Sequence, residues 1–261
     1  MIPSSQRWMK APFPYFGGKT DAAPHVWAAL GDVAHYAEPF CGSLAVLLHR
    51  PHPCNRPYND ETVNAADGLL VNAWRAIQLH PAATAEAASN PVAEADLHAR
   101  HCAMVHWREE QQLEHLMGDP IFCDPVMAGW WLWGQSSTIG GTWCRRTGAW
   151  WPDETGRLRK HGASGVHRSK PHISTAGNGV NGLSLREIGT EHHEITMPRL
   201  REWFNFLSAR LRSVRILNGD WKRLCTDGAL RTLECRCGND GIIGVFLDPP
   251  YSHELRERCY S

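Results

Sequence analysis

The residues best suited to chemistry form the tetrapeptide Asp248-Pro249-Pro250-Tyr251, which follows the apolar run 244–247. A carboxylate and a backbone carbonyl that the prolines free from sheet pairing can each accept a hydrogen bond from one N–H of an exocyclic amine. Such bonds draw the nitrogen toward a tetrahedral shape and aim its lone pair at a methyl donor. The tyrosine offers a face on which a base taken out of a duplex can stack. The competing interpretation is a Pro-Pro turn that ends a strand.

A second segment, 38–43, reads Glu-Pro-Phe-Cys-Gly-Ser and joins an apolar run to a helical pattern. Gly42 permits close approach of the backbone to a ligand, and the N-terminus of the following helix favours a carboxylate. Glu38 is placed to meet an ammonium group of the same ligand. An amino-acid moiety satisfies both requirements, although an ordinary tight turn explains the segment equally well.

Two further segments combine aromatic, flexible and charged residues. Residues 14–19 read Pro-Tyr-Phe-Gly-Gly-Lys, and residues 218–221 read Asn-Gly-Asp-Trp. In the second, Asp220 is suited to bond an adenine amino group, with the Trp221 indole packed beside it. Taken alone, each segment is equally well explained as a surface turn.

The elements that position these segments are short apolar runs alternating with helical patterns. Strands that end in acidic or glycine-bearing turns, with helices between them, indicate a doubly wound α/β sheet that binds ligands at its carboxyl edge. The chemistry is therefore expected on those turns. The sequence predicts strands at 34–38, 214–217 and 242–247, and helices at 20–30, 43–49, 67–79, 94–117 and 198–211.

Composition changes between residues 119 and 196. Six of the twelve tryptophans fall between Trp130 and Trp151, and a stretch rich in Gly, His, Arg and Ser follows with little periodicity. These features predict an inserted domain built largely from loops, between catalytic-domain segments 1–118 and 197–261. Most of the tryptophans are expected to form a small aromatic core rather than to stack on bases.

Formal net charge is zero, from 27 Lys and Arg against 27 Asp and Glu, so global electrostatics does not argue for a nucleic-acid partner. The insert nevertheless carries a local basic run. Nine cysteines without framework spacing suit a reducing compartment, and no His and carboxylate cluster has metal-ligand spacing. With no signal peptide and no membrane span in the sequence, a cytoplasmic location is expected. The basic residues are Arg145, Arg146, Arg157, Arg159, Lys160, Arg168 and Lys170.

Taken in order, the four segments resemble the Dam family of DNA adenine methyltransferases, and its phage and prophage members more closely. Residues 61–77 and 171–180 resemble further segments of that family. The resemblance implies a Rossmann-like domain for S-adenosyl-L-methionine (AdoMet), an inserted target-recognition domain, base flipping, and a double-stranded DNA partner contacted through Arg145, Arg146, Arg168 and Lys170. It implies a monomer when complete. The expected AdoMet neighbours are Tyr15, Gly17, Gly18, Lys19, Glu38, Phe40, Gly42, Asp67 and Asp220; Asp248, Pro249, Pro250 and Tyr251 would hold the adenine.

Three features depart from the family pattern. Leu44 stands where many members have a further glycine, and Ala65 follows Asn64 where an acid that binds the ribose is usual, so Asp67 is ranked first for that role and Asp60 second. The chain stops ten residues after Tyr251, while the family's sheet continues; the sequence is therefore expected to be truncated, and poorly soluble or inactive as it stands. A DNA-binding relic and a cytosine-N⁴ methyltransferase remain alternatives. A dinucleotide-dependent oxidoreductase is weaker because no G-x-G-x-x-G follows the first strand.

Overall fold

Four short strands run parallel in one sheet: β1 (His35–Glu38), β2 (Glu61–Ala65), β5 (Val214–Asn218) and β6 (Ile243–Val245), in the order β5-β2-β1-β6. They come from a computed structural model, which describes residues 9–15, 17–51, 61–90, 93–110, 112–137, 143–144, 150–152, 155, 158–160, 192–226 and 242–249. Helices flank the sheet, so the predicted α/β class with a parallel sheet is confirmed. All four strands end at one edge of the sheet.

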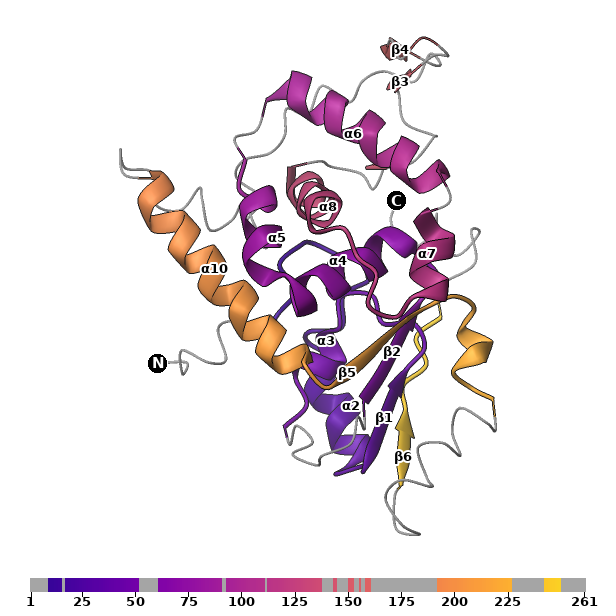
Figure 1. The fold of residues 1–261 in the computed structure, drawn as a ribbon. Coiled ribbons are helices and arrows are strands. Elements are labelled where there is room, and N and C mark those ends of the chain that lie inside the picture. Colours follow the sequence, from indigo (N-terminus) through magenta and orange to yellow (C-terminus); the bar gives the residue numbers. More distant parts are fainter. Residues whose placement is uncertain are drawn as a thin grey trace.

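The helices divide into two groups (Figure 1). α2 and α3 lie beside the strands, while α4, α5, α8 and α10 pack against one another in a helical layer. A separate antiparallel pair, β3 (Trp150–Pro152) and β4 (Leu158–Lys160), lies beyond α6. No described helix has both the length and the apolar character needed to cross a membrane. The helix bounds are α2 Ala23–Leu30, α3 Ala45–Leu48, α4 Gly68–Leu79, α5 Pro81–Ala88, α6 Glu94–Glu109, α7 Gln112–Gly118, α8 Pro125–Ser137 and α10 His192–Leu211.

Helix α4 is central to the core. Asp67 caps its N-terminus by accepting a hydrogen bond from the Leu69 N–H at 3.0 Å. Every residue from Gly68 to Ile77 is buried, because the sheet covers one side of the helix and the helical layer covers the other. Pro81 then starts α5, where its missing N–H costs nothing. The helix predicted at 67–79 is confirmed.

Arg75 of α4 holds the strands and the helical layer together. Its guanidinium is buried and donates to the Ile216 carbonyl on β5 twice, at 3.1 Å each. It also donates to the Leu116 and Asp119 carbonyls at 2.8 and 2.9 Å. Burial lowers the pKa of Arg75 from its ordinary value, and the surrounding carbonyl dipoles compensate the buried charge.

Two expectations differ from the structure. The single helix predicted at 94–117 is divided into α6 and α7, and α7 turns to contact β5 and α4. Residues 125–137, expected within a loop-rich insert, form helix α8 and share the core of the helical layer. Gly129 permits this close packing, since a Cβ there would lie 2.4 Å from the Cβ of Ala87 on α5. The insert's basic residues Arg145, Arg146, Arg157, Arg168 and Lys170 lie outside the described residues.

Three indoles of the predicted insert are buried, but they belong to the main hydrophobic core and not to a separate small aromatic core. Trp131, Trp133 and Trp143 are each at most 5% exposed. Trp133 packs edge-on against Trp143, with ring centroids 6.2 Å apart. These three rings are therefore structural in the free protein.

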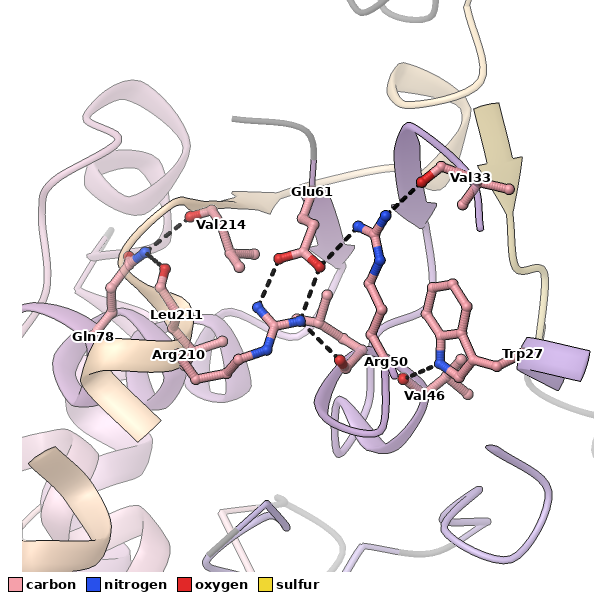
Figure 2. A network of polar contacts seen from close by, with 10 residues as sticks. Trp27, Val33, Val46, Arg50, Glu61, Gln78, Arg210, Leu211 and Val214 are labelled. Atoms are coloured by element: carbon pink, nitrogen blue, oxygen red, sulfur yellow. Dashed lines mark hydrogen bonds and ion pairs between the residues drawn. The ribbon is translucent and has the colours of Figure 1, made fainter. Parts of the chain in front are cut away.

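Two buried guanidinium groups share the carboxylate of Glu61, at the start of β2 (Figure 2). Arg210, near the end of α10, donates to both carboxylate oxygens at 2.7 and 2.9 Å. Arg50, after α3, donates to the same carboxylate at 3.1 Å and to the Val33 carbonyl. All three side chains are less than 10% exposed. The cluster therefore joins β2, α3 and α10 at the amino edge of the sheet.

Glu61→Gln is expected to lower the free energy of unfolding by about 3–5 kcal/mol, because it leaves two buried guanidinium groups without a counter-charge. Urea unfolding of the variant and the parent measures the difference. The matched control is Glu86→Gln on the exposed face of α5, which is expected to change stability by about 0.5 kcal/mol or less. Equal effects of the two substitutions would show that the buried cluster does not stabilise the fold.

Candidate functional site

The turns that follow the strands meet at the carboxyl edge of the sheet. The Asn64 side chain, near the end of β2, donates to the Pro39 carbonyl after β1 at 3.1 Å and to the Gly219 carbonyl after β5 at 3.0 Å. The Cys41 N–H donates to the Asn64 carbonyl at 2.9 Å. One buried amide thus joins the two predicted ligand-binding turns, a role that the sequence analysis did not assign to Asn64.

An ion pair joins the predicted N-terminal segment to the predicted catalytic tetrapeptide. Lys19 Nζ lies 2.6 Å from Asp248 Oδ2, and each side chain is 27% exposed. The same ammonium donates to the Gly17 carbonyl at 2.8 Å. Strand β6 brings Asp248 to this position by pairing with β1, and the Phe246 N–H donates to the Ala37 carbonyl at 2.9 Å. Two segments from opposite ends of the chain therefore share one site.

Glu38 lies in the interior of this site, at the end of β1. The residue is 3% exposed, and its carboxyl group accepts a hydrogen bond from the Tyr36 hydroxyl at 3.1 Å. Burial raises the pKa of Glu38 to about 8; the charge of Asp248 adds to this, and hydrogen bonds from Tyr36 and the Leu47 backbone oppose it. Glu38 is therefore mostly neutral at pH 7 in the free protein.

Tyr36 is a site residue that the sequence analysis missed. It stands two positions before Glu38, so the strand places both side chains on one face. Burial, followed by the charge of Glu38, raises the pKa of the Tyr36 hydroxyl above its ordinary value, which keeps it a hydrogen-bond donor. The sequence did contain a signal for Tyr36, because residues two positions apart in a strand lie on the same face, and Glu38 was already a predicted site residue.

Gly42 allows the aromatic ring of Tyr15 to lie against the turn after β1. Its φ is +45°, and a Cβ at this position would lie 2.8 Å from Cε1 of Tyr15. The Gly42 carbonyl accepts a hydrogen bond from the Trp74 indole at 3.0 Å, and Phe13 packs between Tyr15 and Trp74. Glycine at this position thus has two structural causes, the positive φ and the close ring, while approach of a ligand to this backbone stays a prediction.

Leu44 stands at one of the departures from the family pattern. Its φ is +55°, in the left-handed region that favours glycine, and it caps the N-terminus of α3. Full burial of the side chain in the core holds this strained backbone in place. A glycine would adopt this backbone conformation without strain.

The remaining predicted residues lie around the same edge. The rings of Phe40 and Trp221 are 5.7 Å apart between centroids, and Trp221 is 39% exposed. Asp67 and Asp220 are exposed, and each uses one oxygen to cap a helix, Asp220 by accepting from the Lys222 N–H at 2.8 Å. Gly17, Gly18 and Pro249 are exposed. Phe16, Asp60, Pro250 and Tyr251 lie outside the described residues.

The site's chemistry rests on carboxylates, a lysine and aromatic rings. In the described part of the chain, no group of three or more His, Cys, Asp or Glu side chains is arranged to hold a metal ion. The comparisons with known proteins give no match to a family model or to a curated protein. The fold therefore describes the chain: it is an α/β protein with a parallel sheet, whose carboxyl edge carries an ion-paired acid, a buried acid and two neighbouring aromatic rings, of which Trp221 is exposed.

A double-mutant cycle tests the contact between Gly42 and Tyr15. Gly42→Ala is expected to cost about 1–3 kcal/mol more in the parent than in a Tyr15→Ala background, because the added Cβ overlaps the ring only when the ring is present. Urea unfolding of the four proteins gives the coupling energy. Zero coupling would mean that the ring moves aside without cost.

The raised pKa of Glu38 predicts a specific pH dependence of stability. The unfolded carboxyl ionises near its ordinary value of 4.5 and the folded one near 8, so the folded state binds more protons between these values. Its contribution to stability is complete below pH 4.5 and is lost as pH rises toward 8. Between pH 5 and 8.5 the parent is expected to lose a few kcal/mol relative to Glu38→Gln. Parallel stability profiles of the two proteins, measured by urea unfolding, would contradict a raised pKa.

Proposed function

We propose that this protein is an AdoMet-dependent DNA methyltransferase that modifies the exocyclic amine of an adenine taken out of the duplex. The observation that carries the proposal is the position of Asp248, ion-paired with Lys19 at the carboxyl edge and next to the turn after β1. An acid that follows one strand and a glycine turn that follows the neighbouring strand can serve two reactants side by side. This arrangement supports a Rossmann-like AdoMet domain.

The turn after β1 offers the features that an amino-acid-bearing cofactor needs. Glu38, at the end of β1, is proposed to meet an ammonium group, and Gly42 lets the Tyr15 ring lie close against the turn. Because Glu38 is mostly neutral in the free protein, binding of a cation beside it would release a proton. AdoMet, when bound, supplies a methyl group on a sulfonium. Phe40 and Trp221 offer apolar surface for the adenine ring of the cofactor, with Asp220 beside them.

Asp248 is suited to orient the amine that is methylated. In the free protein the Lys19 ammonium occupies a hydrogen-bonding position on its carboxylate. The amine of a flipped adenine would take that position as an N–H donor, and Lys19 would turn aside. A carboxylate hydrogen bond increases electron density on the nitrogen and fixes its orientation toward the methyl donor. Pro249, Pro250 and Tyr251 complete the proposed adenine site, the tyrosine as a stacking surface.

Double-stranded DNA is the proposed partner. Arg145, Arg146, Arg168 and Lys170 are proposed to contact its phosphates, with an affinity that decreases as salt increases. Cytosine-N⁴ methylation would use nearly the same acid and turn, so analysis of the methylated base distinguishes the two reactions.

Transfer of a tritiated methyl group from AdoMet to unmethylated DNA tests the proposal. The product is expected to be N⁶-methyladenine, and Asp248→Ala is expected to lower the rate about 100-fold or more, because the group that orients the amine is lost. The assay is run on this chain and on a form extended beyond residue 261. The control is Asp32→Asn, an exposed acid before β1, which is expected to retain activity.

Equilibrium binding of AdoMet gives a second readout that needs no turnover. Binding that weakens in Glu38→Gln and persists in Asp248→Ala would assign the two acids to cofactor and substrate. DNA binding without AdoMet binding or methyl transfer in either form would instead favour the DNA-binding relic.

A further inference from the structure

A second cluster of polar and aromatic side chains lies away from the sheet edge, between α6 and α8. Arg100 and His101 are consecutive on α6, and Trp143 follows α8 in the chain. The Arg100 guanidinium stacks 4.3 Å from the ring centroid of Trp133, and the His101 ring lies 5.6 Å from the Trp143 ring. The Trp143 ring fills the space beside Gly134, where a Cβ would lie 1.9 Å from Cε2 of the indole. These side chains form one contiguous group.

The tautomer of His101 follows from its backbone partner. The Cys144 N–H donates to Nδ1 of His101 at 3.3 Å, so Nδ1 is the acceptor and the proton of the neutral ring is on Nε2. Burial, with a smaller effect from His98, lowers the pKa of His101, which favours this neutral form. His101 Nε2 is therefore an N–H donor.

Three donors in the cluster lack an acceptor. Arg100 Nη1, His101 Nε2 and Trp143 Nε1 are shielded from solvent and have no hydrogen-bond partner in the described part of the structure. Trp143 is 5% exposed. Asp96, one turn before Arg100, acts on the guanidinium charge but does not accept a hydrogen bond from Nη1. Buried donors without acceptors are costly, so three in one cluster indicate that an acceptor is supplied from elsewhere.

We propose that Arg100, His101 and Trp143 form an anion site that binds a phosphate oxygen, and that the DNA backbone supplies this phosphate. Three N–H donors, one of them cationic, match an oxyanion and no cation. Helix α6, which carries Arg100 and His101, also contacts β3, and the paired strand β4 contains Arg159 and Lys160 in its sequence (Figure 1). Only the source of the phosphate rests on the proposed function.

Thermal unfolding with inorganic phosphate tests the anion site directly. Phosphate is expected to raise the melting temperature of the parent more than chloride does at equal ionic strength. Three variants should lose this difference: Trp143→Phe removes the indole N–H, His101→Asn keeps an acceptor for Cys144 but removes the Nε2 donor, and Arg100→Met keeps an apolar stem beside Trp133. An equal response to phosphate in the parent and all three variants, or no response in the parent, would overturn the site.

The matched control is Trp27→Phe. Trp27 is also a buried indole, but its N–H donates to the Val46 carbonyl at 2.7 Å, far from this cluster. This variant is expected to melt at a lower temperature and to keep the phosphate response. Loss of the response here as well would mean that the effect reports general destabilisation, which overturns the assignment.

Fluorescence anisotropy with a DNA duplex tests the source of the phosphate. Arg100→Met is expected to weaken DNA binding about tenfold and Trp143→Phe about fivefold, and the salt dependence of binding should decrease by about one phosphate contact for Arg100→Met. Unchanged DNA affinity, with the phosphate response lost, would overturn DNA as the source and leave free phosphate as the ligand. If the parent binds no DNA, the proposed function fails, while the phosphate experiment still decides whether the site exists.

Discussion

Glu61 sits between two arginines that reach it from different parts of the chain, and the arrangement of the sheet depends on this contact. Arg50 arrives after α3 and Arg210 at the end of α10, so the carboxylate fixes both helices to the first residue of β2. Gln78 adds to the same end of the structure by donating to the Leu211 and Val214 carbonyls (Figure 2). With the amino edge held in this way, the register of the parallel strands determines which turns meet at the opposite edge.

Strand β2 shows why part of the fold was not visible in the sequence. Its residues are Glu, Thr, Val, Asn and Ala, and all five are buried. Glu61 and Asn64 are satisfied by partners far away in the chain, so a search for apolar runs passes over them. By contrast, β1, β5 and β6 carry apolar patterns that local reasoning detects. Polar residues in a central strand become compatible with burial only when their tertiary partners are known.

Helix α8 illustrates a different limit. The sequence analysis predicted loops there from the change of composition and the weak periodicity of 119–196, and Gly129, Gly134, Ser136 and Ser137 do lower the helix propensity of this segment. In the structure the two glycines are contact positions, one for α5 and one for the Trp143 ring, while both serines donate to carbonyls one turn earlier.

At the candidate site, the sequence analysis selected Asp248, Lys19 and the turn that contains Gly42. The pairing of Lys19 with Asp248 and the burial of Glu38 depend on strand order, which no local pattern specifies.

The amide of Asn64 has a mechanical consequence for the carboxyl edge. Because the amide donates to the Pro39 and Gly219 carbonyls at once, the turns after β1 and β5 are held at a fixed distance from each other. Each turn carries one of the two neighbouring rings, Phe40 and Trp221. Moving the two turns apart would break hydrogen bonds of the buried Asn64 side chain, so the spacing between the rings is set before any ligand binds. The size of a ligand that fits between these turns thus depends on a buried side chain of strand β2, in addition to the rings themselves.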